Sequence, residues 1–135
     1  MTDWTTLRRV AAEAMARAYA PYSGYPVGAA LECADGSVIG GCNVENASFP
    51  AGICAERAAV AAAVSTGHRQ FRRLALCTTG AQPAAPCGVC RQVLMEFAPT
   101  LDIVSFTPGG AEARWSLGDL LPAPFVFRPS SHGAA

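Results

Sequence analysis

Two short stretches of the sequence carry reactive side chains at high density. In "CAERAAV", Cys54 and Glu56 stand directly before a run of alanines that we expect to be buried. In "PCGVCRQVL", Cys87 and Cys90 form a Cys-x-x-Cys pair. We expect each stretch to open a helix, and the free N–H groups and positive dipole end of a helix N-terminus stabilise thiolates. Both stretches are therefore expected at helix N-termini, where the thiolate form of cysteine is stabilised.

Three thiolates at one point would form a metal site. Cys54, Cys87 and Cys90 could fill three tetrahedral positions around a zinc ion, each about 2.3 Å from it. Three protein ligands leave one position open for water, which is typical of catalytic zinc sites, and zinc lowers the pKa of such a water to about 7. Glu56 begins the same helix as Cys54 and is suited to shuttle protons. Arg57 could offset the excess negative charge by hydrogen-bonding to the sulfurs.

Other interpretations of the cysteines stay open on the residues alone. A Cys-x-x-Cys pair can serve redox chemistry, but that chemistry needs no third cysteine near a glutamate. A structural zinc site needs a fourth ligand; His68 lies at the far end of its helix, and His132 lies in the last residues of the chain. Cys33, Cys42 and Cys77 fall in expected strands, and we interpret them as small core residues.

The order of expected helices and strands predicts an α/β fold. Asp35 and Gly36 form a strong hairpin signal between two strands, and Pro99 ends a helix. The expected elements are a helix over 3–19, two strands within 27–46, a helix over 54–66, a strand over 72–79, a helix over 88–98, strands over 102–108 and 113–117, and a short helix over 117–122. Such alternation argues for helices on both faces of a mixed sheet. We expect a single domain over 1–135 with a loose tail at 129–135.

Composition excludes several classes of function. Hydrophobic residues make up 51% of the 135 residues, charged residues only 15%, and the net charge is zero. The pairs Arg8-Arg9 and Arg72-Arg73 are too small for a nucleic-acid footprint, and we interpret them as solvated faces. No apolar run approaches the length of about 18 residues that a membrane span needs, and the N-terminus has no signal-peptide form. We therefore expect a cytoplasmic protein that binds neither nucleic acid nor membrane.

The motifs resemble a known family. "GCNVENASFPAGICAERAAV", followed by "PCGVCRQVLMEF", is similar to the zinc-dependent cytidine deaminases in their small, tetrameric, three-cysteine form, from about Tyr22 to Pro122. The resemblance implies a three-layer α/β/α fold with a mixed five-stranded sheet, one zinc ion per chain and a homotetramer. It also implies that Cys54, Cys87 and Cys90 are the ligands and that Glu56 is the catalytic acid and base.

The resemblance also implies residues that bind the substrate. Asn43 and Glu45 match residues that bind ribose hydroxyls, although the same spacing suits ordinary strand-end residues. Tyr25 falls where the family usually has Phe, and the backbone of Ala55 is expected to contact the base. Phe125 falls where an aromatic residue reaches a neighbouring subunit's active site. The chain departs from the family in "FVFRPSS", and blasticidin-S deaminases, which are close relatives, also end in an aromatic-Val-aromatic pattern.

These features predict an enzyme of pyrimidine salvage. We expect hydrolytic deamination of cytidine and 2′-deoxycytidine to uridine and 2′-deoxyuridine, with release of ammonia. We expect nucleotides and single-stranded DNA to be poor substrates, because Glu45 places a negative charge beside the sugar. The alternatives are deamination of a bulkier, blasticidin-S-like cytosine nucleoside and a non-catalytic zinc-binding module.

Overall fold

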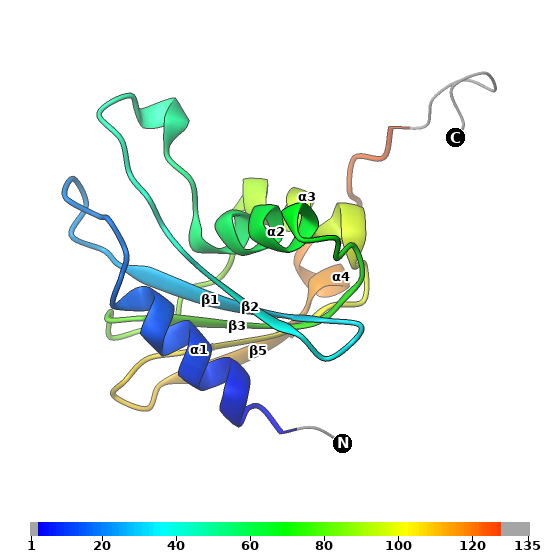
Figure 1. Ribbon diagram of the computed structural model, residues 1–135, viewed down its shortest axis with the longest axis horizontal. Helices are drawn as coiled ribbons and strands as arrows, with labels where there is room; N and C mark the ends of the chain where they lie inside the picture. The colour runs from blue at the N-terminus through cyan, green and yellow to red at the C-terminus, as the bar shows by residue number, and fades with distance from the viewer. Residues whose placement is uncertain (1–2, 128–135) are drawn as a thin grey trace.

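A five-stranded sheet with helices on both faces accounts for residues 3–127, the part of the chain that the computed structural model describes (Figure 1). The predicted loose tail at 129–135 and His132 lie outside these residues. The elements are α1 (Thr5–Met15), β1 (Val27–Cys33), β2 (Val38–Cys42), a 3₁₀ turn (Phe49–Ala51), α2 (Ala55–Ser65), β3 (Phe71–Thr78), α3 (Gly88–Phe97), β4 (Asp102–Phe106), β5 (Glu112–Ser116) and α4 (Leu117–Leu120).

The sheet is mixed, as predicted. The strand order is β2-β1-β3-β4-β5. β3 and β4 are parallel, and the other neighbouring strands are antiparallel. The predicted hairpin joins β1 to β2 at Gly36, whose φ of +92° favours glycine over residues with a Cβ atom. β3 therefore lies at the centre of the sheet, and α3 connects it to its parallel neighbour β4.

The helices form a layer on each side of the sheet (Figure 1). α1 covers one face, while α2, α3 and α4 cover the other. Successive strand residues point to opposite faces: Leu31 and Leu76 are buried in the core under α2 and α3, while Ala30 and Ala75 are buried under α1. No helix within residues 3–127 is long and apolar enough to cross a membrane.

Two glycines allow these helices to approach the sheet closely. A Cβ atom on Gly28 in β1 would lie 1.9 Å from the carbonyl oxygen of Ala11 in α1. A Cβ atom on Gly41 in β2 would lie 2.4 Å from the backbone nitrogen of Ala59 in α2. Both distances are far below any real contact, so each glycine fixes the spacing between the sheet and one helix layer.

The first helix is shorter than the sequence predicted. We expected it over 3–19, but α1 ends at Met15. The N–H of Arg17 donates to the carbonyl of Ala14 at 2.9 Å, which tightens the chain into a turn. The N–H of Tyr19 then donates to the carbonyl of Asn43 at 3.0 Å. A tertiary hydrogen bond therefore replaces the last helical turn.

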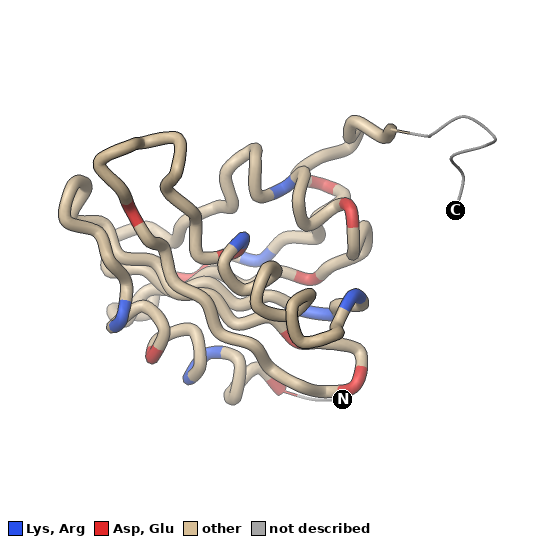
Figure 2. The backbone as a smooth tube through the Cα atoms, turned by 45° about the horizontal axis from the view of Figure 1, so that its top comes forward, with Lys and Arg blue, Asp and Glu red and all other residues tan. Residues whose placement is uncertain are grey.

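Two of the four paired arginines are not simply solvated. Arg73 donates to both carboxylate oxygens of Glu32, at 2.7 and 2.9 Å across the β1–β3 pair, and its guanidinium lies 4.7 Å from the centre of the Trp4 ring. Arg8 donates to Glu112 of β5. The prediction of solvated faces is wrong for Arg8 and Arg73, because both connect α1 and its preceding residues to the sheet. Figure 2 shows basic and acidic positions interspersed over the described backbone.

The three cysteines outside the two reactive stretches differ in burial. Cys33 and Cys77 are buried, as predicted. Cys42 is only half-buried, so its interpretation as a core residue is wrong. It ends β2, which is an edge strand with one side unpaired in the sheet.

Candidate active site

The three predicted ligand sulfurs lie together at the N-termini of α2 and α3. The Sγ atoms of Cys54, Cys87 and Cys90 all lie within 4.8 Å of one another, and those of Cys54 and Cys87 are 3.8 Å apart. Sulfurs at two corners of a tetrahedron, each about 2.3 Å from zinc, are separated by about 3.8 Å. The trio therefore fits a zinc ion in both chemistry and spacing.

Local backbone structure explains why these sulfurs converge. Cys54 and Cys87 are the N-cap residues of α2 and α3, with extended φ/ψ values of −76°/157° and −69°/167°. Neither helix has a side-chain hydrogen bond at its N-cap, although Ser, Thr, Asp and Asn are the usual cap residues. The positive ends of two helices are thus directed at the sulfur group, where they stabilise negative charge.

The thiols of the Cys-x-x-Cys pair differ in acidity. Partial burial works against ionisation of Cys87, but a hydrogen bond from the backbone N–H of Cys90, together with bonds to the Cys90 and Cys54 thiols, lowers the pKa of Cys87 below its usual value. Burial, followed by the nearby Glu56 carboxylate and the other two thiolates, raises the pKa of Cys90. Because three anionic sulfurs repel one another, a bound cation is what allows all three to be thiolates together.

Arg57 lies beside this sulfur group. One guanidinium nitrogen is 3.7 Å from the Sγ atom of Cys54, within hydrogen-bonding range for sulfur. Hydrogen bonding to Cys54, and then to Cys90, raises the pKa of Arg57 despite partial burial. Its Nε atom is buried and has no hydrogen-bond partner among the described residues. The position suits the predicted role of offsetting thiolate charge, which stays a prediction.

Glu56 is a buried carboxylate next to the sulfur group. It is only 5% exposed, and burial raises its pKa, against weaker opposing effects from its own backbone N–H, Cys90 and Arg57. A carboxyl group whose pKa is shifted toward neutrality can both accept and return a proton near pH 7. The geometry therefore suits the proton-shuttling role predicted for Glu56.

A cavity of about 240 Å³ opens onto these groups. It is lined by most of the residues predicted to act on or bind a substrate, together with small and apolar ones: Ser23, Tyr25, Val27, Asn43, Glu45, Cys54, Ala55, Glu56, Leu76, Ala84, Ala85 and Cys87. Sequence positions from 23 to 87 thus meet in one catalytic cavity. The cavity lining thus combines the reactive groups with the polar side chains of Ser23, Asn43 and Glu45.

Asn43 and Glu45 are engaged with the segment before β1. The Asn43 side chain accepts from the N–H of Val27 at 2.8 Å and donates to the carbonyl of Tyr25 at 3.0 Å. The Glu45 carboxylate accepts from the backbone N–H groups of Tyr22 and Ser23 at 2.9 and 3.1 Å, and from the Ser23 hydroxyl. These bonds, that of the Ser23 hydroxyl first, keep the pKa of Glu45 below its usual value. Both side chains therefore shape the cavity wall, whatever else they bind.

A family model described as the cytidine and deoxycytidylate deaminase zinc-binding region matches residues 1–106 of the chain. The chain belongs to this deaminase family. Its site is a zinc site, and Cys54, Cys87 and Cys90 are the group of described residues that could hold the ion. This membership confirms the family resemblance and the predicted cofactor.

Individual relatives agree with the family match. A cytidine deaminase of Sporosarcina psychrophila is 40% identical over 123 residues, covering 90% of each chain. One of Mycobacterium tuberculosis is 43% identical over 123 residues, covering 91% of this chain and 90% of the relative. The crystal structure of a cytidine deaminase from Burkholderia pseudomallei is 46% identical, covers 93% of this chain and all of its own, and superposes with a TM-score of 0.87. The predicted α/β fold with a mixed five-stranded sheet is confirmed.

Phe125 does not line the catalytic cavity of its own chain. Its side chain is 72% exposed, and the adjoining Val126 and Phe127 are exposed as well. The Gln92 side chain of α3 donates to the carbonyl of Phe125 at 2.9 Å, which fixes this part of the C-terminal segment against the deaminase fold. An exposed aromatic ring on an anchored backbone suits contact with another molecule.

Sequence reasoning missed two residues that shape this deaminase site. Ser23 was not singled out, because a serine in a turn is unremarkable without its partner Glu45. Arg91 was overlooked although it stands inside the quoted Cys-x-x-Cys stretch. Its guanidinium donates to the carbonyl of Pro86 at 2.7 Å and to that of Leu120 at 3.0 Å. It thereby ties the loop before Cys87 to the end of α4, a long-range contact that no local pattern indicates.

Proposed function

We propose that this chain hydrolyses the bond between C4 and the amino nitrogen of cytidine and 2′-deoxycytidine, giving uridine or 2′-deoxyuridine and ammonia. Its relatives of 40–43% identity over 123 residues are named cytidine deaminases. The observation that carries the proposal is the buried Glu56 carboxyl, with a raised pKa, beside three converging sulfurs in a cavity. A purely structural zinc site does not need a buried proton-carrying group.

The chain's own residues supply most of the chemistry. Zinc, when bound, acts as a Lewis acid that makes water nucleophilic near neutral pH. Glu56 takes one proton from the attacking water and delivers it to N3 of the base. It then takes the second water proton from the hydroxyl now attached to C4 and delivers it to the 4-amino nitrogen, so that the C4–N bond breaks as C4=O forms and ammonia leaves. Burial of Glu56 keeps this proton from exchanging freely with solvent. The Arg57 guanidinium, 3.7 Å from the Cys54 sulfur, would offset part of the negative charge of the thiolates.

Two polar residues of the cavity, Asn43 and Glu45, are proposed to bind the sugar. If the base lies against Glu56 and the backbone of Ala55, these two side chains remain in the lining to bind hydroxyl groups. The ionised Glu45 disfavours a phosphate nearby, so a nucleoside is the preferred substrate over a nucleotide or a nucleic acid. Tyr25 lines the same cavity.

The assembly and setting of the enzyme are also proposals. The exposed ring of Phe125 and the apolar residues after it support a homotetramer in which Phe125 reaches a neighbour's cavity. Such an enzyme would act in pyrimidine salvage in the cytoplasm. Replacing Phe125 by alanine should raise KM while zinc stays bound, which kinetics and metal analysis can measure. Unchanged KM would contradict this role.

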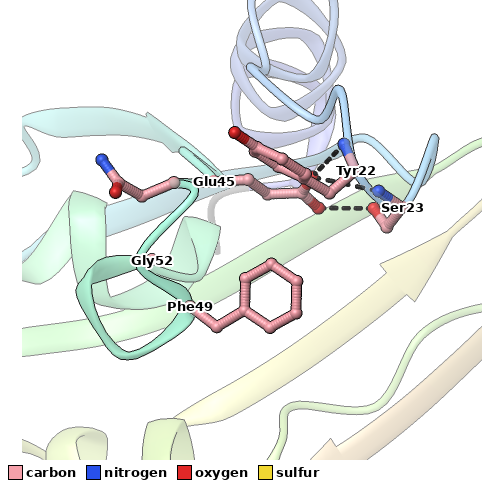
Figure 3. Close-up of a pocket in the computed structure, with 6 residues that line it drawn as sticks. Tyr22, Ser23, Glu45, Phe49 and Gly52 are labelled. Carbon is pink, nitrogen blue, oxygen red and sulfur yellow. Dashed lines mark hydrogen bonds between the residues drawn. The ribbon is translucent and has the colours of Figure 1, made fainter.

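A bulkier cytosine nucleoside is the second candidate substrate, and one observation favours it. A further cavity of about 340 Å³, lined by Tyr22, Phe49 and neighbouring residues, shares Ser23 and Glu45 with the catalytic cavity (Figure 3). The rings of Tyr22 and Phe49 lie 5.9 Å apart, edge to face, so this further cavity offers an aromatic surface next to Ser23 and Glu45.

One experiment separates these possibilities. Zinc-loaded protein is assayed by the ultraviolet change on deamination with cytidine, 2′-deoxycytidine, cytidine monophosphate and blasticidin S, and Glu56→Gln serves as the control that keeps every metal ligand. We expect the two simple nucleosides to be turned over far faster than the nucleotide. Preference for blasticidin S would favour the second candidate. Zinc binding with no turnover of any of the four compounds would refute the proposed deamination.

A further inference from the structure

The turn before β1 is held by a short chain of hydrogen bonds that ends on Glu45, and Figure 3 shows its last bond, from Ser23 to Glu45. The Ser23 hydroxyl accepts a hydrogen bond from the backbone N–H of Tyr25 at 3.0 Å. The same hydroxyl donates to Oε2 of Glu45. Because a hydroxyl has a single proton and the amide of Tyr25 can only donate, the direction of this chain is fixed, and the Ser23 proton is directed at Glu45.

The two oxygens of Glu45 are held in different ways. Oε1 accepts the backbone N–H groups of Tyr22 and Ser23, so the backbone alone fixes it. Oε2 has one protein partner in the described residues, the Ser23 hydroxyl. A carboxylate can accept about four hydrogen bonds in all. One acceptor position therefore remains, on Oε2, and this is the oxygen whose place depends on a side chain.

Loss of the Ser23 hydroxyl would leave the carboxylate anchored at Oε1 only. The terminal torsion of a glutamate is broad, so the group could then pivot about that oxygen. Oε2 would no longer have a fixed position on the cavity wall. A mobile acceptor binds a hydrogen-bond donor less well than a fixed one, because the acceptor side chain loses conformational entropy on binding.

We propose that Ser23 is a positioning residue that fixes Oε2 of Glu45 for a sugar hydroxyl and so makes the enzyme selective for hydroxylated sugars. This inference rests on the proposed nucleoside deamination. Ser23 acts through Glu45, and its effect depends on the 2′- and 3′-hydroxyls of the substrate. A residue that only stabilised the turn would affect all nucleosides alike.

The test compares two substrates that differ only in those hydroxyls. Zinc-loaded wild type, Ser23→Ala and Ser23→Thr are assayed with cytidine and with 2′,3′-dideoxycytidine. For Ser23→Ala we expect kcat/KM on cytidine to fall about 10- to 100-fold, mainly through KM, as for loss of a hydrogen bond to a charged group. On 2′,3′-dideoxycytidine we expect a change within about twofold. Ser23→Thr, which keeps the hydroxyl, should recover most of the cytidine activity.

Two controls separate positioning from folding. Ser37→Ala removes a comparable serine-to-carboxylate bond, 2.6 Å to Asp35, in the distant β1–β2 turn, and should change neither substrate. Adding Ser23→Ala to Glu45→Gln should cause little further loss on cytidine, because the two residues act as one unit. The melting temperature of each zinc-loaded variant shows that it is folded.

The outcomes are distinct. Equal losses on both substrates, no loss on cytidine, or additive losses in the double variant would overturn the role of Ser23 while leaving deamination intact. A wild type that deaminates neither nucleoside would refute the proposed function, and this inference with it.

Discussion

Replacing Gly41 by alanine tests whether the spacing between β2 and α2 controls the active site. The new Cβ atom would lie 2.4 Å from the backbone nitrogen of Ala59 and 2.7 Å from the carbonyl oxygen of Ala55. Ordinary contact begins at 3.4 Å, so the shortfall at Ala59 is about 1 Å. Both atoms belong to backbone, which cannot rotate away as a side chain can. α2 or β2 must therefore move by about that distance.

The expected size of the effect follows from this displacement. Overpacking of this kind costs about 1–3 kcal/mol, partly offset by the lower unfolded-state entropy of alanine, about 0.4–1 kcal/mol. For a chain of this size, 1 kcal/mol corresponds to about 3–5 °C in melting temperature. Because α2 carries Glu56 and has Cys54 as its N-cap, a shift of about 1 Å should also lower kcat, by up to about 100-fold.

Gly40→Ala is the matched control. It makes the same change one residue earlier in β2, but its Cβ atom would meet the side chain of Val10 in α1 at 3.1 Å, and a side chain can adjust. We expect Gly41→Ala to melt several degrees lower and turn over more slowly than Gly40→Ala, with both measured on zinc-loaded protein. If Gly41→Ala matched the control in melting temperature and kcat, the argument that backbone contact sets the position of α2 would fail.

Four further substitutions test the site and its support. Glu56→Gln should keep zinc and fold but lose at least about 10²- to 10⁴-fold in turnover; near-normal turnover would contradict its role. Cys90→Ala should lose zinc, as measured by metal analysis, and melt at a lower temperature, because the ion connects α2 to α3; full zinc retention would remove Cys90 from the ligands. Arg91→Leu breaks bonds to two carbonyls and should destabilise the fold by about 2–4 kcal/mol and speed zinc loss to a chelator; unchanged chelation kinetics would separate Arg91 from the metal loop. Hydrogen bonds from Arg73 are the main cause of the lowered pKa of Glu32. The ionised Glu32 carboxylate therefore stabilises the folded chain above the unfolded pKa of about 4.3, and this stabilisation is lost as pH falls through the lower pKa of the folded state. The deficit of Glu32→Gln relative to wild type, about 2–3 kcal/mol at pH 7, should therefore shrink as the pH falls below about 4. A deficit in thermal unfolding that stays constant below this pH would refute the ion-pair explanation.

Local sequence signals were sufficient to predict the helices and strands and the three cysteines of the metal site. The Asp35-Gly36 turn predicts its hairpin, because a positive φ at Gly36 is a property of the residue itself. Cys54 and the Cys-x-x-Cys pair indicate the metal site since each falls at a strand-to-helix transition that the hydrophobic pattern reveals. The convergence of Cys54 and Cys87 needed only the expectation that two helices start at the same side of one sheet.

Long-range pairing was not readable from the sequence. Arg73 looked solvated because its partner Glu32 lies 41 residues away, and register alone places them opposite each other. The end of α1 depends on Tyr19 pairing near Asn43, and the close approach at Gly41 depends on how α2 crosses β2. None of these contacts leaves a periodic or compositional trace, so only the folded chain reveals them.

The reactive groups and the walls of the catalytic cavity come from different kinds of segment, and this separation has an evolutionary consequence. The sulfurs and Glu56 stand at the starts of helices, where backbone geometry fixes them. Ala84 and Ala85, which line the same cavity, belong to the loop between β3 and α3 and carry only methyl groups. Loops accept substitutions more readily than helix starts do. A library confined to 79–85 could therefore alter which base substituents the cavity admits without touching a metal ligand, so substrate range in this scaffold can diverge while the hydrolytic machinery stays unchanged.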